Sequence, residues 1–126
     1  MPIRVLIADD SELMRRQIRR TIEPDPDIEI CAESENGVEA VRKAQDCRPD
    51  LVIMDVSMPL MNGLEATQVI KTLVPNLPVL VFAIDDSNQI RIESQRAGAD
   101  AFLLKADGGV QLCRTIRTLV RRPLAA

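Results

Sequence analysis

Short aliphatic runs alternate with amphipathic stretches along the whole sequence. Four of the runs contain four consecutive apolar residues, a pattern typical of strands that are covered on both faces of a parallel sheet. A fifth run alternates between polar and apolar positions and predicts a strand near a sheet edge. The four continuous runs are residues 5–8, 51–54, 79–82 and 101–104, and the alternating run is 28–32.

The stretches between these runs carry apolar residues at helical spacing. In the first of them, Met14, Ile18 and Ile22 recur every four residues, and Asp10 or Ser11 is a suitable N-cap. Four arginines of this helix are expected to face outward: Arg15, Arg16, Arg19 and Arg20.

The later helices differ in how well their apolar positions anchor them. The second is expected to turn Val38, Val41 and Ala44 inward. The fourth, capped by Ser87, has few apolar positions and should be weakly anchored, whereas the fifth has a clear stripe and is expected to end by Pro123. Five strand–helix units with right-handed crossovers predict a doubly wound α/β fold: a five-stranded parallel sheet with five helices on its two faces.

Composition and charge narrow the function. A chain of 126 residues suits one domain. It has no histidine, which excludes histidine-activated nucleophiles and zinc sites that need imidazole. A net charge of −3 argues against direct nucleic-acid binding by this domain. No apolar run approaches the roughly 20 residues that cross a membrane, and three cysteines without metal-ligand spacing indicate reduced thiols in a cytoplasmic protein.

The residues that follow the predicted strands include most of the candidate chemistry. They are Asp9 and Asp10 after the first strand, Asp55 after the third, Ala83 after the fourth and Lys105 after the fifth. Ligands of open parallel sheets lie outside the carboxyl ends of the strands, so these side chains should converge. Three carboxylates repel one another unless a cation neutralises them, and oxygen ligands alone suit Mg²⁺. With a lysine beside them, they predict a phosphoryl-transfer site in which a carboxylate is the nucleophile.

Each of these residues has a simpler interpretation when it is taken alone. Asp10 is a suitable helix cap, Asp55 a suitable start of a turn, and Lys105 a suitable solvated side chain. The convergence of all four charges on one sheet edge favours the site.

The charged positions and their neighbours resemble the receiver domain of response regulators. The resemblance rests on residues 7–11 (Ile-Ala-Asp-Asp-Ser), on Asp55, on Met58-Pro59 and Asn62-Gly63 behind it, and on Lys105. It implies a flavodoxin-like fold with strand order 2-1-3-4-5. Residues 1–121 would form the receiver, and 122–126 a tail or the start of a linker. Residues 24–27 and 61–67 are most similar to receivers that precede a LuxR-type helix-turn-helix DNA-binding domain, which implies transcription regulation.

The resemblance implies a role in a two-component system or phosphorelay and assigns the site residues. Asp55 would be the phospho-acceptor, and its donor would be a sensor histidine kinase or a phosphotransfer protein. Lys105 would contact the phosphoryl group. The Mg²⁺ ligands would be Asp9, Asp10, Asp55 and the Ser57 carbonyl. Such a domain is not an enzyme, because it catalyses only its own phosphorylation and dephosphorylation.

One position departs from the family pattern. Receivers normally have Thr or Ser at the end of the fourth strand, where this sequence has Ala83, followed by Ile84. The missing hydroxyl would have bonded the phosphoryl oxygen, and the aromatic switch residue of the family, Phe102, is present. Phosphorylation is therefore expected to be weakly coupled to the conformational change. The alternative is an atypical receiver that acts as a phosphorylation-independent interaction module.

Two further hypotheses are open at the level of the sequence. A Mg²⁺-dependent phosphatase with an aspartate nucleophile would need a second acid two residues after Asp55, where Ser57 stands. Arginines of the first and last helices are candidates for a docking or homodimer surface, with solubility as the alternative role. They are Arg15, Arg16 and Arg19, and Arg114, Arg117 and Arg121.

Overall fold

The computed structural model describes residues 2–120 and contains one five-stranded sheet with five α-helices. The strands are β1 (Ile3–Ala8), β2 (Ile28–Ser34), β3 (Leu51–Met54), β4 (Val79–Ala83) and β5 (Ala101–Leu104). The helices are α1 (Glu12–Ile22), α2 (Gly37–Asp46), α3 (Gly63–Leu73), α4 (Asn88–Arg96) and α5 (Gly108–Val120), and the 3-10 turn η1 (Lys105–Asp107) precedes α5. All strand pairs are parallel, in the order β2-β1-β3-β4-β5. The predicted fold and strand order are confirmed.

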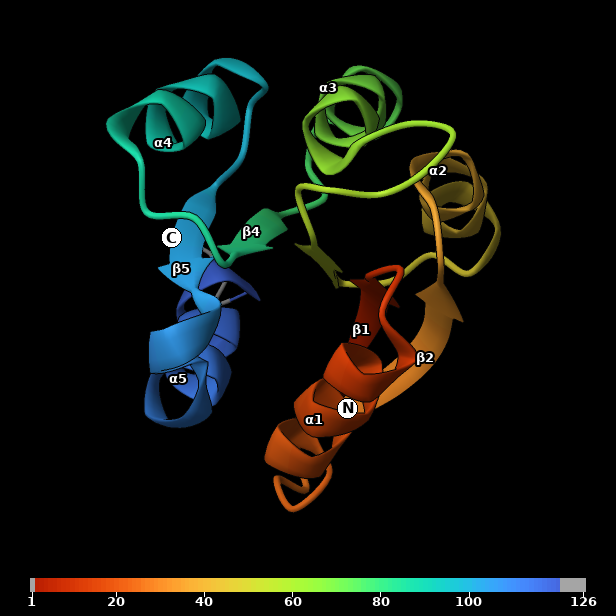
Figure 1. The fold of residues 1–126 in the computed structure, drawn as a ribbon. Helices are drawn as coiled ribbons and strands as arrows, with labels where there is room; N and C mark the ends of the chain where they lie inside the picture. Colours follow the sequence, from red (N-terminus) through yellow and green to blue (C-terminus); the bar gives the residue numbers. More distant parts are fainter. Residues whose placement is uncertain (1, 121–126) are drawn as a thin grey trace, which may run out of the picture.

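The helices cover both faces of the sheet (Figure 1). Helices α1 and α5 lie on one face, where Ile18, Ile22, Leu112 and Ile116 join the core. Helices α2 and α3 lie on the other face, beside α4. Continuous apolar runs serve both cores because successive strand residues point to opposite faces. β5 is half-exposed along its length because it is an edge strand, so the expectation that it is fully covered is wrong.

The helix starts follow the predicted capping chemistry. Ser11, not Asp10, caps α1 and accepts a hydrogen bond from the Met14 amide at 3.2 Å. This leaves the Asp10 carboxylate free of a capping role. Ser87 caps α4, and Ser94 is the buried residue of that helix, so the expected weak apolar anchoring is confirmed. The predicted end of the last helix at Pro123 lies outside the described residues.

Two expectations about helix faces are wrong. Arg15 is only 9% exposed, because its guanidinium turns toward the end of β1 and pairs with Glu33 instead of facing solvent. Val38 is 50% exposed, and Ala40 takes the inward position on α2. In α1 the predicted apolar face is nevertheless correct, since Ile18 and Ile22 are buried in the core, and Arg15 is buried through its polar contacts.

A bulge in the edge strand β2 sets its register against β1. Val5 is level with Ile30, but Leu6 is level with Ala32, so one residue of β2 is skipped. A bulge of this kind moves every later residue of the strand by one position. As a result Ser34 is level with Ala8, and its carbonyl accepts the Asp9 amide at 3.0 Å. Within residues 2–120, no helix is long and apolar enough to cross a membrane.

Candidate functional site

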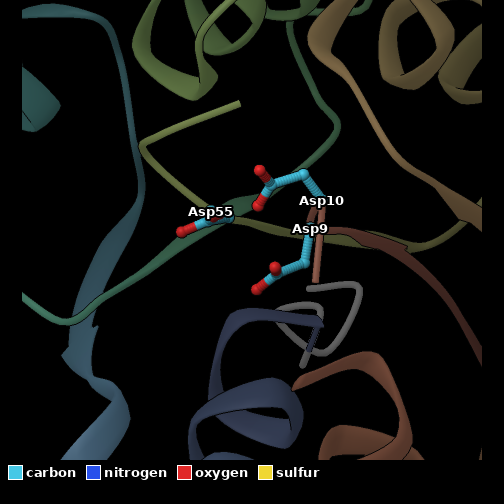
Figure 2. A group of neighbouring side chains, drawn as sticks. All are labelled: Asp9, Asp10 and Asp55. Carbon is cyan, nitrogen blue, oxygen red and sulfur yellow. The ribbon is translucent and has the colours of Figure 1, made fainter. Parts of the chain in front are cut away.

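Three carboxylates gather at the carboxyl edge of the sheet (Figure 2). Asp9 and Asp10 directly follow β1, and Asp55 directly follows β3, which neighbours β1 in the sheet. One carboxylate oxygen from each lies within 4.8 Å of the others. Asp9 and Asp55 are buried, whereas Asp10 is exposed. The convergence that the chain order predicts is present in the structure.

Lys105 is the positive group of this cluster. Its ammonium donates to Asp9 Oδ2 at 2.8 Å and to Asp55 Oδ1 at 3.0 Å. The Lys105 side chain is only 8% exposed. It comes from η1, directly after β5, at the same edge of the sheet. The lysine is therefore held between two carboxylates from distant parts of the sequence.

Burial and neighbouring charges shift the pKa values of Asp55 and Lys105. Burial raises the pKa of Asp55 above its ordinary value of 3.8, the neighbouring charge of Asp9 raises it further, and Lys105 opposes both effects. Burial by itself would lower the pKa of Lys105, but its hydrogen bonds to Asp9 and Asp55 leave that pKa raised. Lys105 therefore does not fully offset the burial of Asp55 and its repulsion by Asp9, since the pKa of Asp55 remains raised.

The donor set fits a hard divalent cation. The three converging side chains offer only carboxylate oxygens, with no imidazole or thiolate among them. Mg²⁺ prefers such ligands and keeps several bound waters. Asp10 is exposed, so this side of the cluster is open to those waters. Ser57, whose carbonyl is the expected fourth ligand, lines the same cavity.

A cavity of about 340 Å³ opens over the cluster. Its walls come from the loops after β1, β3 and β4 and from α1, α4 and η1. The lining residues are Asp9, Asp10, Ser11, Met14, Asp55, Val56, Ser57, Ala83, Ile84, Asp85, Ile90 and Lys105. All the expected phosphoryl and cation residues line this one space, together with Ala83.

Phe102 does not line this cavity. Its ring is half-buried in β5, with the Arg91 guanidinium of α4 stacked 4.5 Å from the ring centroid. Arg91 in turn donates to Asp86 at 2.7 Å. Sequence reasoning missed this contact, because no local pattern relates a helix arginine to an aromatic residue on the following strand.

Gly63, at the start of α3, lets the helix approach the Asp55 backbone. A Cβ atom at this position would lie 1.7 Å from the Asp55 carbonyl oxygen, so the backbone would have to move. We expect Gly63→Ala to lower the free energy of unfolding by about 1–3 kcal/mol, as overpacked interiors do. Urea denaturation measures this loss.

Gly109 supplies the matched control for that substitution. A Cβ there meets no atom within 4 Å, and the residue lies in α5. Gly109→Ala should therefore raise stability by up to about 1 kcal/mol through helix propensity. Equal effects of the two substitutions would contradict the close approach at Gly63.

The predicted arginine surface is not a single positive face. Arg15 and Arg19 both pair with Glu33. Arg117 of α5 pairs with Asp25 and Asp27, in the loop before β2. Arg121 lies outside the described residues. Arg16 lies 3.9 Å from Glu12 of its own helix, so acidic neighbours offset the charge of four of the six arginines.

Comparison with known proteins gives a consistent result. The family model of the response regulator receiver domain matches residues 5–119. A protein-glutamate methylesterase/protein-glutamine glutaminase of Pyrococcus abyssi is 38% identical over 87% of this chain and 30% of its own length. The response regulator protein VraR of Staphylococcus saprophyticus is 34% identical over 93% of this chain and 56% of its own length.

Solved structures match over nearly the whole chain. The response regulator domain of Thermotoga maritima CheB shares 32% identity with a TM-score of 0.90, covering 98% of this chain and all of that one. A LuxR-family two-component response regulator from Aurantimonas shares 28% identity, also with a TM-score of 0.90, over 95% of this chain and 86% of that one. The resemblance to LuxR-type receivers is confirmed, and methylesterase receivers match as well.

The relatives differ in length. The chain spans about 30% of the methylesterases that it matches and about half of the transcriptional regulators. What the relatives share with it is therefore the receiver part. Since the family model covers residues 5–119 and relatives above 30% identity align over most of the sequence, this chain belongs to the response regulator receiver domain family.

Proposed function

We propose that this receiver accepts a phosphoryl group on Asp55 and passes the signal to an output domain or partner. The observation that carries the proposal is the pairing of Asp55 with Lys105 at 3.0 Å, beside two further carboxylates in an open cavity. A nucleophilic carboxylate, a fixed ammonium and a set of cation ligands are the parts that phosphoryl transfer requires.

The proposed transfer uses few protein groups. One Asp55 oxygen is held by Lys105, which leaves the other oxygen to attack the phosphorus atom of a phosphohistidine. The new O–P bond forms as the P–N bond to the donor imidazole breaks, and the imidazole nitrogen leaves with the bonding electron pair. Lys105 then offers its charge to a phosphoryl oxygen. The sequence has no histidine of its own, so the donor is a residue outside it.

Asp9, Asp10, Asp55 and the Ser57 carbonyl are the proposed ligands of Mg²⁺. When bound, the ion would neutralise charge on the phosphoryl oxygens and on the carboxylates. Asp9 is fixed by two bonds, from the Ser11 amide at 2.9 Å and from Lys105. Asp10 is exposed, and within residues 2–120 its carboxylate has no hydrogen-bond partner. It can therefore bind the ion without losing a contact to the protein.

A second candidate function is a phosphorylation-independent interaction module. The observation that favours it is Ala83, which lines the cavity with a methyl group where the family has a hydroxyl. Under this alternative Asp55 is not phosphorylated, and the domain binds its partner at all times. The phosphatase alternative lacks support, because Ser57 offers no second acid beside the nucleophile.

Phosphoryl labelling separates these functions. We expect acetyl phosphate or a cognate kinase to label the wild type in the presence of Mg²⁺, and chelation of the metal to abolish labelling. Asp55→Asn should lose the label, whereas Asp46→Asn, at the exposed end of α2, should retain it. An unlabelled wild type with a folded spectrum would contradict the proposal and support the interaction module.

The output and location are also part of the proposal. Relatives with transcriptional and with methylesterase names both match, which supports an output domain or partner of either kind. The partially buried, unpaired thiols of Cys31, Cys47 and Cys113 support a reducing compartment, the cytoplasm. A homodimer is a further proposal, for which sedimentation with and without beryllofluoride is the test.

A further inference from the structure

The carbonyl group of Asp9 has an unusual partner. The hydrogen-bond ladder between β1 and β3 ends at the Ala8 carbonyl, which accepts the Asp55 amide at 2.9 Å. The next carbonyl, of Asp9, lies beyond the ladder and accepts instead from Arg15 Nη1 of α1 at 2.7 Å. This bond is buried.

The Arg15 guanidinium is itself held in place. Its Nε donates to Glu33 Oε1 at 3.0 Å, and its side chain is only 10% exposed. Arg19, one turn further along α1, donates from Nη1 to both oxygens of the Glu33 carboxylate, at 2.6 Å and 2.7 Å. The bulge in β2 sets the register that brings Glu33 to this position, level with Ile7. Arg15 therefore has little freedom to leave the Asp9 carbonyl.

A fixed carbonyl fixes the residue that follows it. The Asp9 carbonyl and the Asp10 amide belong to one planar peptide unit, so the orientation of the first sets the direction in which Asp10 leaves the chain. The amide of Asp9 donates a hydrogen bond to the Ser34 carbonyl at 3.0 Å, so the backbone is also fixed on the N-terminal side of Asp9. Within residues 2–120, the Asp10 carboxylate has no hydrogen-bond partner, so its orientation depends on its backbone.

We propose that Arg15 is a positioning residue of the cation site. Through the Asp9 carbonyl, and with Glu33 as its anchor, it fixes the Asp9–Asp10 peptide plane so that the Asp10 carboxylate faces Asp55. The inference rests on the proposed function, because it concerns the Mg²⁺ site of the phospho-acceptor. Partners that orient metal ligands in this way typically change metal affinity by about 10- to 100-fold when removed.

The sign of the effect distinguishes positioning from simple electrostatics. Arg15 is a positive charge near a cation site, so removing its charge would tighten Mg²⁺ binding if charge alone mattered. Positioning predicts the opposite: weaker binding in Arg15→Gln. A purely structural role would lower thermal stability and leave the Mg²⁺ affinity unchanged.

The test is a Mg²⁺ titration of the purified chain by calorimetry and by amide shifts of residues 9–11. Arg15→Gln should bind Mg²⁺ about 10- to 100-fold more weakly than the wild type. Glu33→Gln should change the affinity in the same direction by a smaller factor, and Arg15→Lys should recover part of it. The control is Arg16→Gln, an exposed neighbour whose nearest acidic partner, Glu12, is 3.9 Å away, and it should bind as the wild type does.

Each outcome decides the proposal. Equal or tighter binding by folded Arg15→Gln, with normal binding by the wild type, overturns the positioning role and leaves the proposed function intact. Should Arg15→Gln fail to fold, unchanged affinity in Glu33→Gln would overturn the role in its place. A wild type that binds no Mg²⁺ would overturn both this inference and the proposed metal site.

Discussion

Replacing Asp55 with Asn is expected to stabilise the metal-free protein while it destroys the proposed phosphorylation site. Asp55 is 8% exposed and lies in a cluster with two other carboxylates, those of Asp9 and Asp10. Its raised pKa means that the folded protein holds the charged form less favourably than the unfolded chain does. Removing the charge should raise the free energy of unfolding by about 1 kcal/mol. For a domain of this size that corresponds to about 3 to 5 °C in Tm.

The stabilisation should depend on pH in a defined direction. A carboxyl group whose pKa is raised by folding costs stability above that raised value, and the cost disappears as the pH falls through it toward the ordinary value of 3.8. The difference in Tm between Asp55→Asn and the wild type should therefore be full at neutral pH and shrink in acid. Mg²⁺ should reduce the difference too, by stabilising the wild type more.

Thermal unfolding with and without EDTA and Mg²⁺ measures these effects. Asp46→Asn is the control, since this exposed aspartate lies outside the carboxylate cluster. A lower Tm for Asp55→Asn at neutral pH would show that the Lys105 ion pair outweighs burial and repulsion. It would therefore contradict the electrostatic account of the site.

Most of the fold could be predicted because its signals are local or follow from chain order. The aliphatic runs predict the five strands, but they do not identify both edges, because the edge strand β5 has the same continuous run as the central strands. The bulge in β2 could not be predicted, since it depends on pairing between two strands. The burial of Arg15 was missed for a related reason: its partner Glu33 lies on another element, and a helical pattern assigns an arginine to solvent.

The candidate site was predictable to a similar extent. Carboxyl ends of parallel strands meet at one edge, so the positions of Asp9, Asp55 and Lys105 in the chain were sufficient to predict their convergence. The contacts that orient them were not predictable, because they are made by backbone groups and by α1. The Arg91–Phe102 stacking belongs to the same class of contact between distant elements.

The second large effect concerns Ala83. Threonine at this position is expected to strengthen the response of α4 to a phosphoryl mimic. Ala83 is 2% exposed at the end of β4 and lines the cavity over Asp55. A hydroxyl there could donate to a phosphoryl oxygen, and such a bond to a charged group contributes about 1.5–3 kcal/mol. That free energy shifts a two-state equilibrium by roughly 10- to 150-fold.

The sheet register relates this position to Phe102. Val81 of β4 is level with Phe102 of β5, and Ala83 lies two residues further along β4, on the same face as Val81. Arg91 of α4 stacks on the Phe102 ring over that face and is tied to Asp86 in the loop after Ala83. A phosphoryl group that draws residue 83 inward would therefore also move the loop after β4. That loop contains Asp86, which accepts the hydrogen bond from Arg91.

Amide chemical shifts of residues 88–96, with and without beryllofluoride and Mg²⁺, measure the response. We expect small shifts in the wild type and large shifts in Ala83→Thr. Ala83→Val has the shape of threonine without the hydroxyl, so it should respond as the wild type does if the hydrogen bond is the cause. If the amide shifts of the wild type change as much as those of Ala83→Thr, the prediction of weak coupling is wrong. If Ala83→Val responds as strongly as Ala83→Thr, the volume of the side chain causes the response and the hydroxyl does not.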